Sequence, residues 1–343
     1  MNFNRRQLLQ GFGVLCLTPT LPRWAWSNIP ALEGPTMGTR YRIQVRDRSQ
    51  SVYLPTLKGR IERVLTNIDT RMSLYRHDSE LSQFNQSPAL HWKQLSKNTA
   101  DIIATALDIH QHSGGAFNPL TAARVDDWGF GPAARSLKTH AFSEPFIAPI
   151  SAPVPEADTQ LQLAKTQIRK HDPDTTLDLN GIAKGAAVDQ LAAVIAESGI
   201  DDYLVEIGGE IRTGGRGPSG NGWLVGIENP SGGLASTIEL SNQAIATSGD
   251  YIHFFIHQGR RFSHLIDPRT GNPVQHNLAL VSVIADHAIE ADAWATALMI
   301  MGPEQGWQFA LEHEMPALFG IRGYTDIQFR TTPFFGRYNR KIP

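Results

Sequence analysis

The segment of residues 289–301 constrains the fold of this chain most. It is rich in Ala, Leu and Met and contains neither Pro nor Gly, so it predicts a helix. Asp292 and Thr296 are four residues apart within it, and this spacing places both side chains on one face. A carboxylate and a hydroxyl on one face suit a hard cation such as Mg²⁺. A helix cap and its neighbour would explain the same pair, so both interpretations stay open.

The other periodic segments mix strands and helices without a regular alternation. Because the strand-helix-strand rhythm of a doubly wound sheet is missing, the chain predicts an α+β fold. The proline-rich segment 131–158 predicts a surface excursion. The glycine-rich run 214–220 lacks the Gly-Lys-Ser/Thr ending of a P-loop and predicts a hairpin loop between two strands. Strands are expected at 41–45, 203–207, 223–227, 251–256 and 279–284, and helices at 56–67, 98–112 and 183–197.

The first 27 residues differ in composition from the rest of the chain. Arg5 and Arg6 precede a short apolar stretch, 8–17, and a small-residue pattern ends at Ser27. This layout predicts an export signal of the twin-arginine type in residues 1–27, followed by one domain in 28–343. The apolar stretch is far shorter than the roughly 20 residues that span a bilayer. We therefore expect a periplasmic mature chain without membrane insertion.

Charge and cysteine content exclude several classes of function. The formal net charge of the 343 residues is −2, and no basic run is interleaved with aromatics, so nucleic-acid binding is not expected. Cys16 is the only cysteine, and it lies inside the predicted signal. The mature chain would then contain no disulfide, no thiol nucleophile and no cysteine metal site.

Several segments combine polar residues with glycines, which allow backbone conformations that other residues rarely adopt. Asn118-Pro119 could be an Asx-turn, and Asp178 could be a cap. The helix expected after Asp178 would also offer free N–H groups beside Lys184, which together suit an anion. The segments are 36–39, 113–119, 177–185, 246–251 and 263–271.

Taken in order, nine sequence blocks resemble the signature blocks of the ApbE-type FAD:protein FMN transferases, over about residues 34–305. The blocks are Met37-Gly-Thr39, Asp69–Tyr75 with Ser79–Asn85, Gly115–Pro119, Trp128–Gly131, Leu177–Gly185, Ile207–Gly209, Thr247–Tyr251, Asp267–Gly271 and Ala291–Thr296. No single block is decisive, but their number and order are highly specific.

This resemblance implies both a fold and an activity. The fold would be a two-lobed α+β architecture with the flavin in the cleft between the lobes. The activity would be Mg²⁺-dependent transfer of the FMN part of FAD to a threonine hydroxyl of a target protein, with release of AMP. The target would be a flavoprotein subunit of a membrane respiratory complex, and the twin-arginine signal favours the branch linked to maturation of nitrous oxide reductase.

The resemblance also implies site residues. The backbone carbonyl of Gly181 would bind Mg²⁺ together with Asp292 and Thr296. The sequence departs from the family pattern at Asn118, where many relatives have Asp, and at Ala295, where some have a second carboxylate. The residues expected to contact FAD are Met37, Tyr75, Ala116, Phe117, Asn118, Asp178, Lys184 and Ile266.

A threonine hydroxyl is a weak nucleophile at neutral pH and needs a base. We expect His264 to be that catalytic base, because a histidine titrates near neutrality and His264 precedes the polar turn at Asp267. Asp267 and Asp250 are the next candidates. The other histidines of this region, His253, His257 and His276, are expected at the surface.

Two other functions use the same residues. In an Mg²⁺-dependent FAD pyrophosphatase, water would replace the protein hydroxyl. In a non-catalytic periplasmic flavin carrier, the departures at Asn118 and Ala295 would have removed metal binding.

Overall fold

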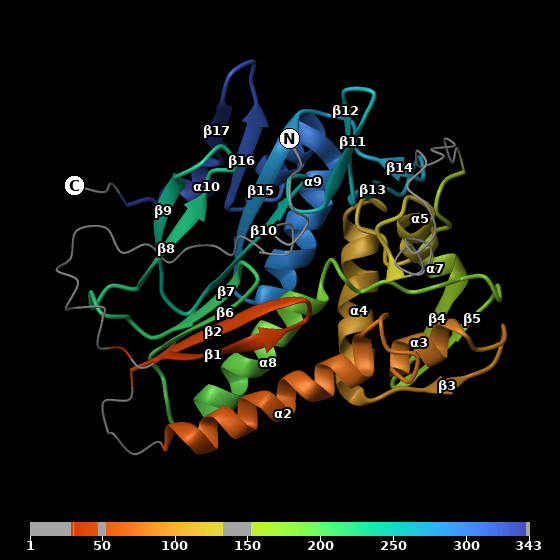
Figure 1. Cartoon of the computed structure of the whole chain (residues 1–343), viewed down its shortest axis with the longest axis horizontal. Helices are drawn as coiled ribbons and strands as arrows, with labels where there is room; N and C mark the ends of the chain where they lie inside the picture. The colour runs from red at the N-terminus through yellow and green to blue at the C-terminus, as the bar shows by residue number, and fades with distance from the viewer. Residues whose placement is uncertain (1–28, 30, 47–52, 133–151, 341–343) are drawn as a thin grey trace, which may run out of the picture.

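An eight-stranded sheet, antiparallel throughout, forms the centre of the computed structural model, which describes residues 29, 31–46, 53–132 and 152–340 (Figure 1). The predicted signal 1–27 lies outside the described residues. An antiparallel sheet mixed with helices confirms the α+β class. In spatial order the strands are β1 (Ala31–Thr36), β2 (Thr39–Val45), β6 (Tyr203–Ile207), β7 (Glu210–Gly214), β10 (Ala244–Gly249), β15 (Leu278–Ala285), β16 (Ala317–Arg322) and β17 (Ile327–Thr331).

The central strands are buried on both faces, which explains their nearly continuous apolar sequences. Every residue of β6 is buried. Val205 and Ile207 belong to the core on one side of the sheet, whereas Leu204 belongs to the core on the other side. This alternation follows from the two-residue period of a strand. Both faces of the sheet must therefore be covered by other elements.

Helices cover one face of the sheet and a strand pair covers the other. Helices α8 (Ala183–Glu197) and α9 (Ala288–Glu312) pack on the first face and against each other. The second face packs against the hairpin of β8 (Trp223–Glu228) and β9 (Leu234–Leu240), with the short α10 (Pro333–Gly336). The beginnings of α8 and α9 are thereby fixed next to each other.

A second group of elements lies to one side of this sheet (Figure 1). Its apolar residues form one continuous core with α8 and β6, so the two lobes are joined by packing and not only by the chain. Helix α2 runs from one lobe to the other along the edge of the molecule. The elements are α2 (Leu54–Met72), α3 (Glu80–Asn85), α4 (Lys97–His112), α5 (Ala122–Asp127), α7 (Ala157–Gln160) and a sheet of β3 (Lys93–Gln94), β5 (Gln167–Lys170) and β4 (Leu161–Ala164).

Two short strand pairs extend from the sheet lobe toward this second group (Figure 1). One is the hairpin of β11 (Phe254–His257) and β12 (Arg260–Ser263), and the other joins β13 (Ile266–Asp267) to β14 (Asn272–Pro273). The stacked rings of Phe262 and Trp128 fix the first hairpin to the second lobe.

The predicted helices are confirmed, α8 with its expected bounds and the others longer than expected. The helix expected at 289–301 continues to Glu312, but its backbone breaks at Gly302, where φ is 87°. Pro303 follows directly and has no N–H for a helical hydrogen bond. The ring of His276 lies against this break, where a Cβ on Gly302 would come within 2.9 Å of it.

Two expectations about strands and loops were wrong. The strand expected at 251–256 begins only at Phe254. The loop 214–220 is no hairpin loop, because β7 and β8 belong to different sheets. Which strands pair depends on tertiary packing, and the local sequence pattern does not determine it. The surface excursion expected at 131–158 is described only at its ends, because residues 133–151 lie outside the described part. Of residues 152–158 only Val154 and Ala157 are buried, and the Val154 N–H bonds the Pro268 carbonyl at 2.7 Å.

Within the described part of the chain, no helix combines the length and the apolar character that crossing a membrane requires.

Candidate functional site

The first turns of α8 and α9 cross in close contact and cap each other. A Cβ on Gly185 would lie 2.2 Å from the Ala288 carbonyl oxygen, so only glycine fits here. The Gly185 N–H of α8 donates to Asp292 Oδ2 of α9 at 2.9 Å. In return, Asp189 of α8 accepts the N–H groups of Ala288 and Ile289 at 3.0 and 2.9 Å. Such caps satisfy N–H groups that a helix start leaves unpaired.

The three expected metal-binding residues lie together at this crossing. Asp292 is buried, and Thr296 lies one helical turn further along α9. A Cβ on Gly181 would lie 3.4 Å from Thr296 Oγ1, which places the loop before α8 against the threonine. Ser248 at the end of β10 bonds the same hydroxyl at 3.0 Å.

The donor set at this point fits Mg²⁺. It consists of a carboxylate, hydroxyls and the backbone of a loop, which are the oxygen ligands that a hard cation takes. Burial raises the pKa of Asp292, while Lys184 and the Gly185 N–H oppose that shift. The carboxylate is therefore short of compensating positive charge, and a cation would supply it. Asp292 does not cap its own helix, whose N-cap is His287, but one of its oxygens caps α8.

A buried ion pair lies beside Asp292. The ammonium of Lys184 bonds Glu210 on β7, whose side chain is 1% exposed. Burial by itself would lower the pKa of Lys184, but the charges of Glu210 and Asp292 outweigh burial and raise it. Glu210 Oε2 is buried, and no described residue gives it a hydrogen bond. Sequence reasoning missed Glu210, although it directly follows the Gly208-Gly209 block.

The loop 113–119 reaches the crossing through Phe117. A Cβ on Gly181 would lie 3.2 Å from the Phe117 ring. Phe117, which is expected to bind FAD, therefore lies next to the expected metal ligands. Ala116 is buried beside it. Both side-chain atoms of Asn118 are engaged by the backbone: Nδ2 donates to the Pro155 carbonyl at 3.0 Å, and Oδ1 accepts the Leu120 N–H at 2.9 Å. The Asx-turn interpretation is therefore confirmed for this side chain.

The remaining expected FAD contacts lie on four different elements. Asp178 is buried, its Oδ1 accepts the Asn180 N–H at 2.7 Å, and burial raises its pKa. Ile266 is buried in β13. Met37 lies in the two-residue turn between β1 and β2, with a positive φ of 46°, and packs partly on the core. Tyr75 follows α2 and is half exposed.

His264, the expected base, is held in one tautomer. Its Nδ1 lies 3.2 Å from the His253 carbonyl oxygen. A carbonyl oxygen can only accept a hydrogen bond, so Nδ1 must carry the hydrogen and Nε2 is the basic nitrogen. Burial, the largest cause, lowers the pKa of His264 together with the nearby charges of His253 and Lys184, and the hydrogen bond to the His253 backbone opposes them in part, which leaves a pKa of about 4. The ring is therefore neutral at pH 7 and able to accept a proton.

Comparison with known proteins agrees with this geometry. The ApbE family profile matches residues 37–319. The FAD:protein FMN transferase of Vibrio cholerae is 35% identical over 320 residues, which cover 89% of this chain and 92% of that protein. The FAD:protein FMN transferase of Escherichia coli K12 is 34% identical over 284 residues, covering 81% and 80%.

Solved structures give the same result. The flavin transferase ApbE of Vibrio cholerae superposes with a TM-score of 0.78 at 32% identity, covering 90% of this chain and 98% of that one. The apo form of the Pseudomonas stutzeri flavinyl transferase ApbE gives a TM-score of 0.80 at 31% identity, covering 91% and 96%. This chain belongs to the ApbE family.

The alternative bases of this ApbE-family protein are occupied. Asp250 forms a two-pronged ion pair with Arg322, and Asp267 forms one with Arg269 at 2.9 Å. Both carboxylates are thus engaged by the guanidinium of a neighbouring arginine. Among the candidates considered, His264 is the group whose basic nitrogen is not engaged.

Two neighbouring histidines have different outcomes: His253 is exposed as expected, whereas His276 is not fully at the surface. The ring of His253 meets the ring of His264 edge-on at 5.4 Å between centroids, and its carbonyl orients His264. His276 is half-buried against the break in α9, and burial lowers its pKa.

A second group of potential metal ligands lies in the ApbE-like second lobe. His110, Glu156 and Asp158 bring their ligand atoms within 4.8 Å of one another. However, His110 Nδ1 bonds the Phe117 carbonyl oxygen at 2.9 Å, and Nε2 accepts the Ala157 N–H at 3.2 Å. Both ring nitrogens are engaged by backbone groups. This histidine therefore holds the loop 113–119 in place and does not indicate a metal centre.

Proposed function

We propose that this ApbE-family protein is an FAD:protein FMN transferase that works with Mg²⁺. It would split the pyrophosphate of FAD, attach the FMN part to a threonine hydroxyl of an acceptor protein and release AMP. The observation that carries this proposal is the convergence of Gly181, Asp292 and Thr296 between the N-termini of α8 and α9. Helix N-termini attract phosphate oxygens, and the oxygen donors suit the metal that would accompany them.

The residues around this point would divide the work. When bound by Gly181, Asp292 and Thr296, Mg²⁺ would offset negative charge on the phosphate oxygens. Lys184 would add a fixed positive charge, held in position by Glu210. Nε2 of neutral His264 would take the proton from the acceptor hydroxyl as that oxygen attacks phosphorus. The loop 113–119 would position the flavin part of FAD against Gly181.

The direct test is to incubate the purified protein with FAD, Mg²⁺ and candidate flavin-carrying domains. A transferase produces a mass increase on the acceptor equal to one FMN group, together with an equal amount of AMP. An FAD pyrophosphatase would release AMP at the same rate with or without acceptor and leave the acceptor mass unchanged. A flavin carrier would bind FAD and produce neither product.

We further propose that the protein acts in the periplasm on a flavoprotein subunit of a membrane respiratory complex. The support is the sequence of residues 1–27, with paired arginines before a short apolar stretch. Replacing Arg5 and Arg6 together by Lys should block export, because a twin-arginine receptor distinguishes guanidinium from ammonium. Unchanged periplasmic amounts of that variant would indicate a general secretory signal instead.

A further inference from the structure

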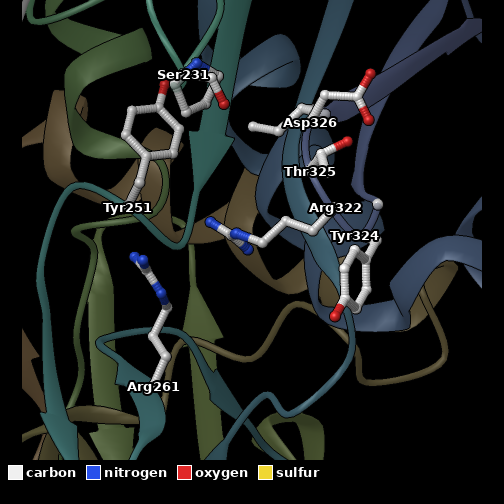
Figure 2. A pocket seen from close by; sticks show the side chains of 10 residues that line it. Ser231, Tyr251, Arg261, Arg322, Tyr324, Thr325 and Asp326 are labelled. Carbon is white, nitrogen blue, oxygen red and sulfur yellow. The ribbon is translucent and has the colours of Figure 1, made fainter.

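Two adjoining cavities lie beside the β11–β12 hairpin, outside the site described above. Their volumes are about 240 and 320 Å³, and both are lined by Arg261 and Arg322. We call them together the arginine pocket. In Figure 2 the two guanidinium groups extend into it from different elements, with Tyr251 beside them. Three arginines, the third being Arg260, line the larger cavity against the single carboxylate of Asp250. Asp326 lines the smaller cavity, so three arginines face two carboxylates and the pocket has a net positive charge.

The hairpin that forms one wall of this pocket has two different faces. Phe255 and Phe262 are directly paired and stack at 5.4 Å, and this face is anchored on Trp128 of the second lobe. Because side chains alternate along a strand, Arg261 and Ser263 lie on the opposite face. That face is the one that lines the pocket.

Two groups in the pocket are buried without a partner. Ser263 is 2% exposed, and no described residue bonds its Oγ. Arg261 Nη1 is likewise buried and unbonded within the described part of the chain. The guanidinium of Arg322 forms an ion pair with Asp250, whereas no described carboxylate forms an ion pair with Arg261. Unpaired buried donors are costly, so the pocket is built for an acceptor that is supplied from outside.

The surroundings of the pocket indicate a protein as the source of that acceptor. Phe254 is 40% exposed beneath the Arg261 guanidinium, which lies 3.8 Å from the ring centroid, and Ile256 on the same strand is 65% exposed. Exposed apolar side chains around a charged pocket are typical of protein interfaces. His264, the proposed base, directly follows Ser263 in the chain, and its ring lies edge-on to that of Phe130, on the anchored side of the hairpin. A protein bound here would therefore contact the hairpin segment that leads directly into the reacting group.

We propose that the arginine pocket and the outer face of the β11–β12 hairpin form the docking surface for the acceptor protein, with an Asp or Glu side chain of the acceptor bound by Arg261 and Ser263. This inference rests on the proposed function and deepens it. The exposed rings and aliphatic groups of the hairpin contact the acceptor around this ion pair. The acceptor threonine is thereby brought to His264 from the hairpin side.

The first test measures binding and turnover separately for Arg261→Gln. The affinity of the FAD-loaded protein for an acceptor domain is measured by calorimetric titration, and transfer is followed by FMN incorporation. Loss of one charge-assisted contact should weaken acceptor binding and raise the acceptor KM about 10-fold or more, while kcat and FAD affinity change less than about 2-fold. Arg63→Gln is the matched control, because Arg63 is exposed on α2 at the far edge of the molecule.

Ser263→Ala supplies a second variant that is not expected to impair folding. It removes a buried hydroxyl that has no described partner, so the thermal midpoint of the free protein should stay the same or rise. Acceptor binding should nevertheless weaken by about 3- to 10-fold. A purely structural role for Ser263 would give the opposite combination, a lower midpoint with unchanged acceptor binding.

The acceptor side is tested by replacing its exposed Asp and Glu residues one at a time by Asn or Gln. One of these changes should have no further effect on binding to Arg261→Gln, because the pair is already broken. Additive losses at every acceptor position would overturn the assignment of a carboxylate. Unchanged acceptor binding and KM in Arg261→Gln would overturn the docking surface, as would Arg261-dependent binding of inorganic phosphate without any effect on the acceptor.

These outcomes are separate from a failure of the proposed function. If the wild-type protein binds an acceptor in an Arg261-dependent manner but never modifies it, the docking surface stands and the transferase assignment fails. If it modifies the acceptor with the same KM in wild type and Arg261→Gln, the transferase stands and the docking surface fails.

Discussion

The α8–α9 crossing and the β11–β12 hairpin differ in how their buried polar groups are paired. At the crossing, Asp189 of α8 caps α9 and Asp292 of α9 caps α8. Lys184 is paired with one oxygen of Glu210, and only the other oxygen of that carboxylate is left without a described partner. At the hairpin, Arg261 and Ser263 have buried atoms that no described residue bonds. Paired buried charges hold a geometry in place, whereas unpaired ones favour the arrival of a ligand.

This difference suggests a division of labour between the two regions. The crossing would keep the phosphate and metal site at a fixed geometry, because catalysis by charge stabilisation requires groups that are already oriented. The hairpin would remain ready for a protein that arrives and leaves in each reaction cycle. Substitutions that break a pairing at the crossing should thus lower the stability, whereas substitutions of Arg261 and Ser263 at the hairpin should weaken acceptor binding without lowering it.

The largest effect is expected from His264→Ala, at the end of the hairpin. The variant should bind FAD and Mg²⁺ about as well as the wild type but transfer FMN on the order of 10²–10⁴-fold more slowly, because the acceptor hydroxyl loses its base. The defect should decrease as the pH rises. Rates of FMN incorporation over a pH series, with flavin fluorescence as the binding control, give the answer. Loss of FAD binding would place His264 in the ligand pocket instead.

The same residue gives a pH dependence of stability with a defined sign. The pKa of His264 falls from its ordinary value of 6.5 to about 4 on folding. Between these values the unfolded chain binds more protons than the folded one, so this histidine destabilises the fold as the pH falls from 6.5 toward 4. His264→Ala should lose less stability than the wild type over that range. Equal losses in denaturant titrations at pH 7 and pH 5 would contradict a buried neutral ring.

Lys184→Met should have the next largest effect, and at the crossing it should appear in stability. Glu210 is 1% exposed, and without its partner its charged form should cost about 3 kcal/mol of unfolding free energy when the pH lies above its raised pKa. Because burial already raises the pKa of Glu210 to about 8, the loss should be smaller at pH 6, where this carboxyl is protonated more readily. Chemical denaturation of both variants tests whether Lys184→Met with Glu210→Leu recovers most of the loss.

Asp292→Asn separates the two roles of Asp292. The amide oxygen can still accept the Gly185 N–H, so the thermal midpoint should stay close to that of the wild type. Loss of the charge should raise the Mg²⁺ concentration needed for transfer by roughly 10–100-fold. Asp292→Ala should show the same metal defect and, in addition, lose about 1 kcal/mol with the cap. Wild-type activity of Asp292→Asn at low Mg²⁺ would leave capping as its only role.

The sequence alone predicted much of the fold because several segments have strong local signals. The Ala-rich run after Gly181 predicted α8 with its observed bounds, and the segment 289–301 predicted the first part of α9. The pairing between strands was harder to predict from the sequence. β8 looked like a partner of β7 but pairs with β9, since both choices bury the same alternating apolar residues.

The site was predictable only in part. The i,i+4 spacing of Asp292 and Thr296 suggested a shared face, whereas the contact with Gly181 came from a resemblance, because no local pattern joins residues more than a hundred positions apart. Asn118 looked like a lost charge, but its amide donates to the Pro155 carbonyl, which a carboxylate could not do. Glu210 gave no signal of its own, because its importance comes from burial beside Lys184.

The smallest effect is expected from Asp189→Ala, which removes the cap of α9 without touching the expected ligands. Two N–H groups at the start of α9 would lose their acceptor, and Arg212 would lose its ion pair, so the unfolding free energy should fall by about 1 kcal/mol. Asp101→Ala is a suitable control, since Asp101 is an exposed helical carboxylate paired only with Lys97 at the surface. At saturating Mg²⁺ both variants should transfer FMN at the wild-type rate, because a bound metal would itself hold α9 against the loop before α8. If Asp189→Ala lowers kcat under those conditions, reciprocal capping sets the geometry of the reacting groups, and the crossing contributes to catalysis beyond its contribution to stability.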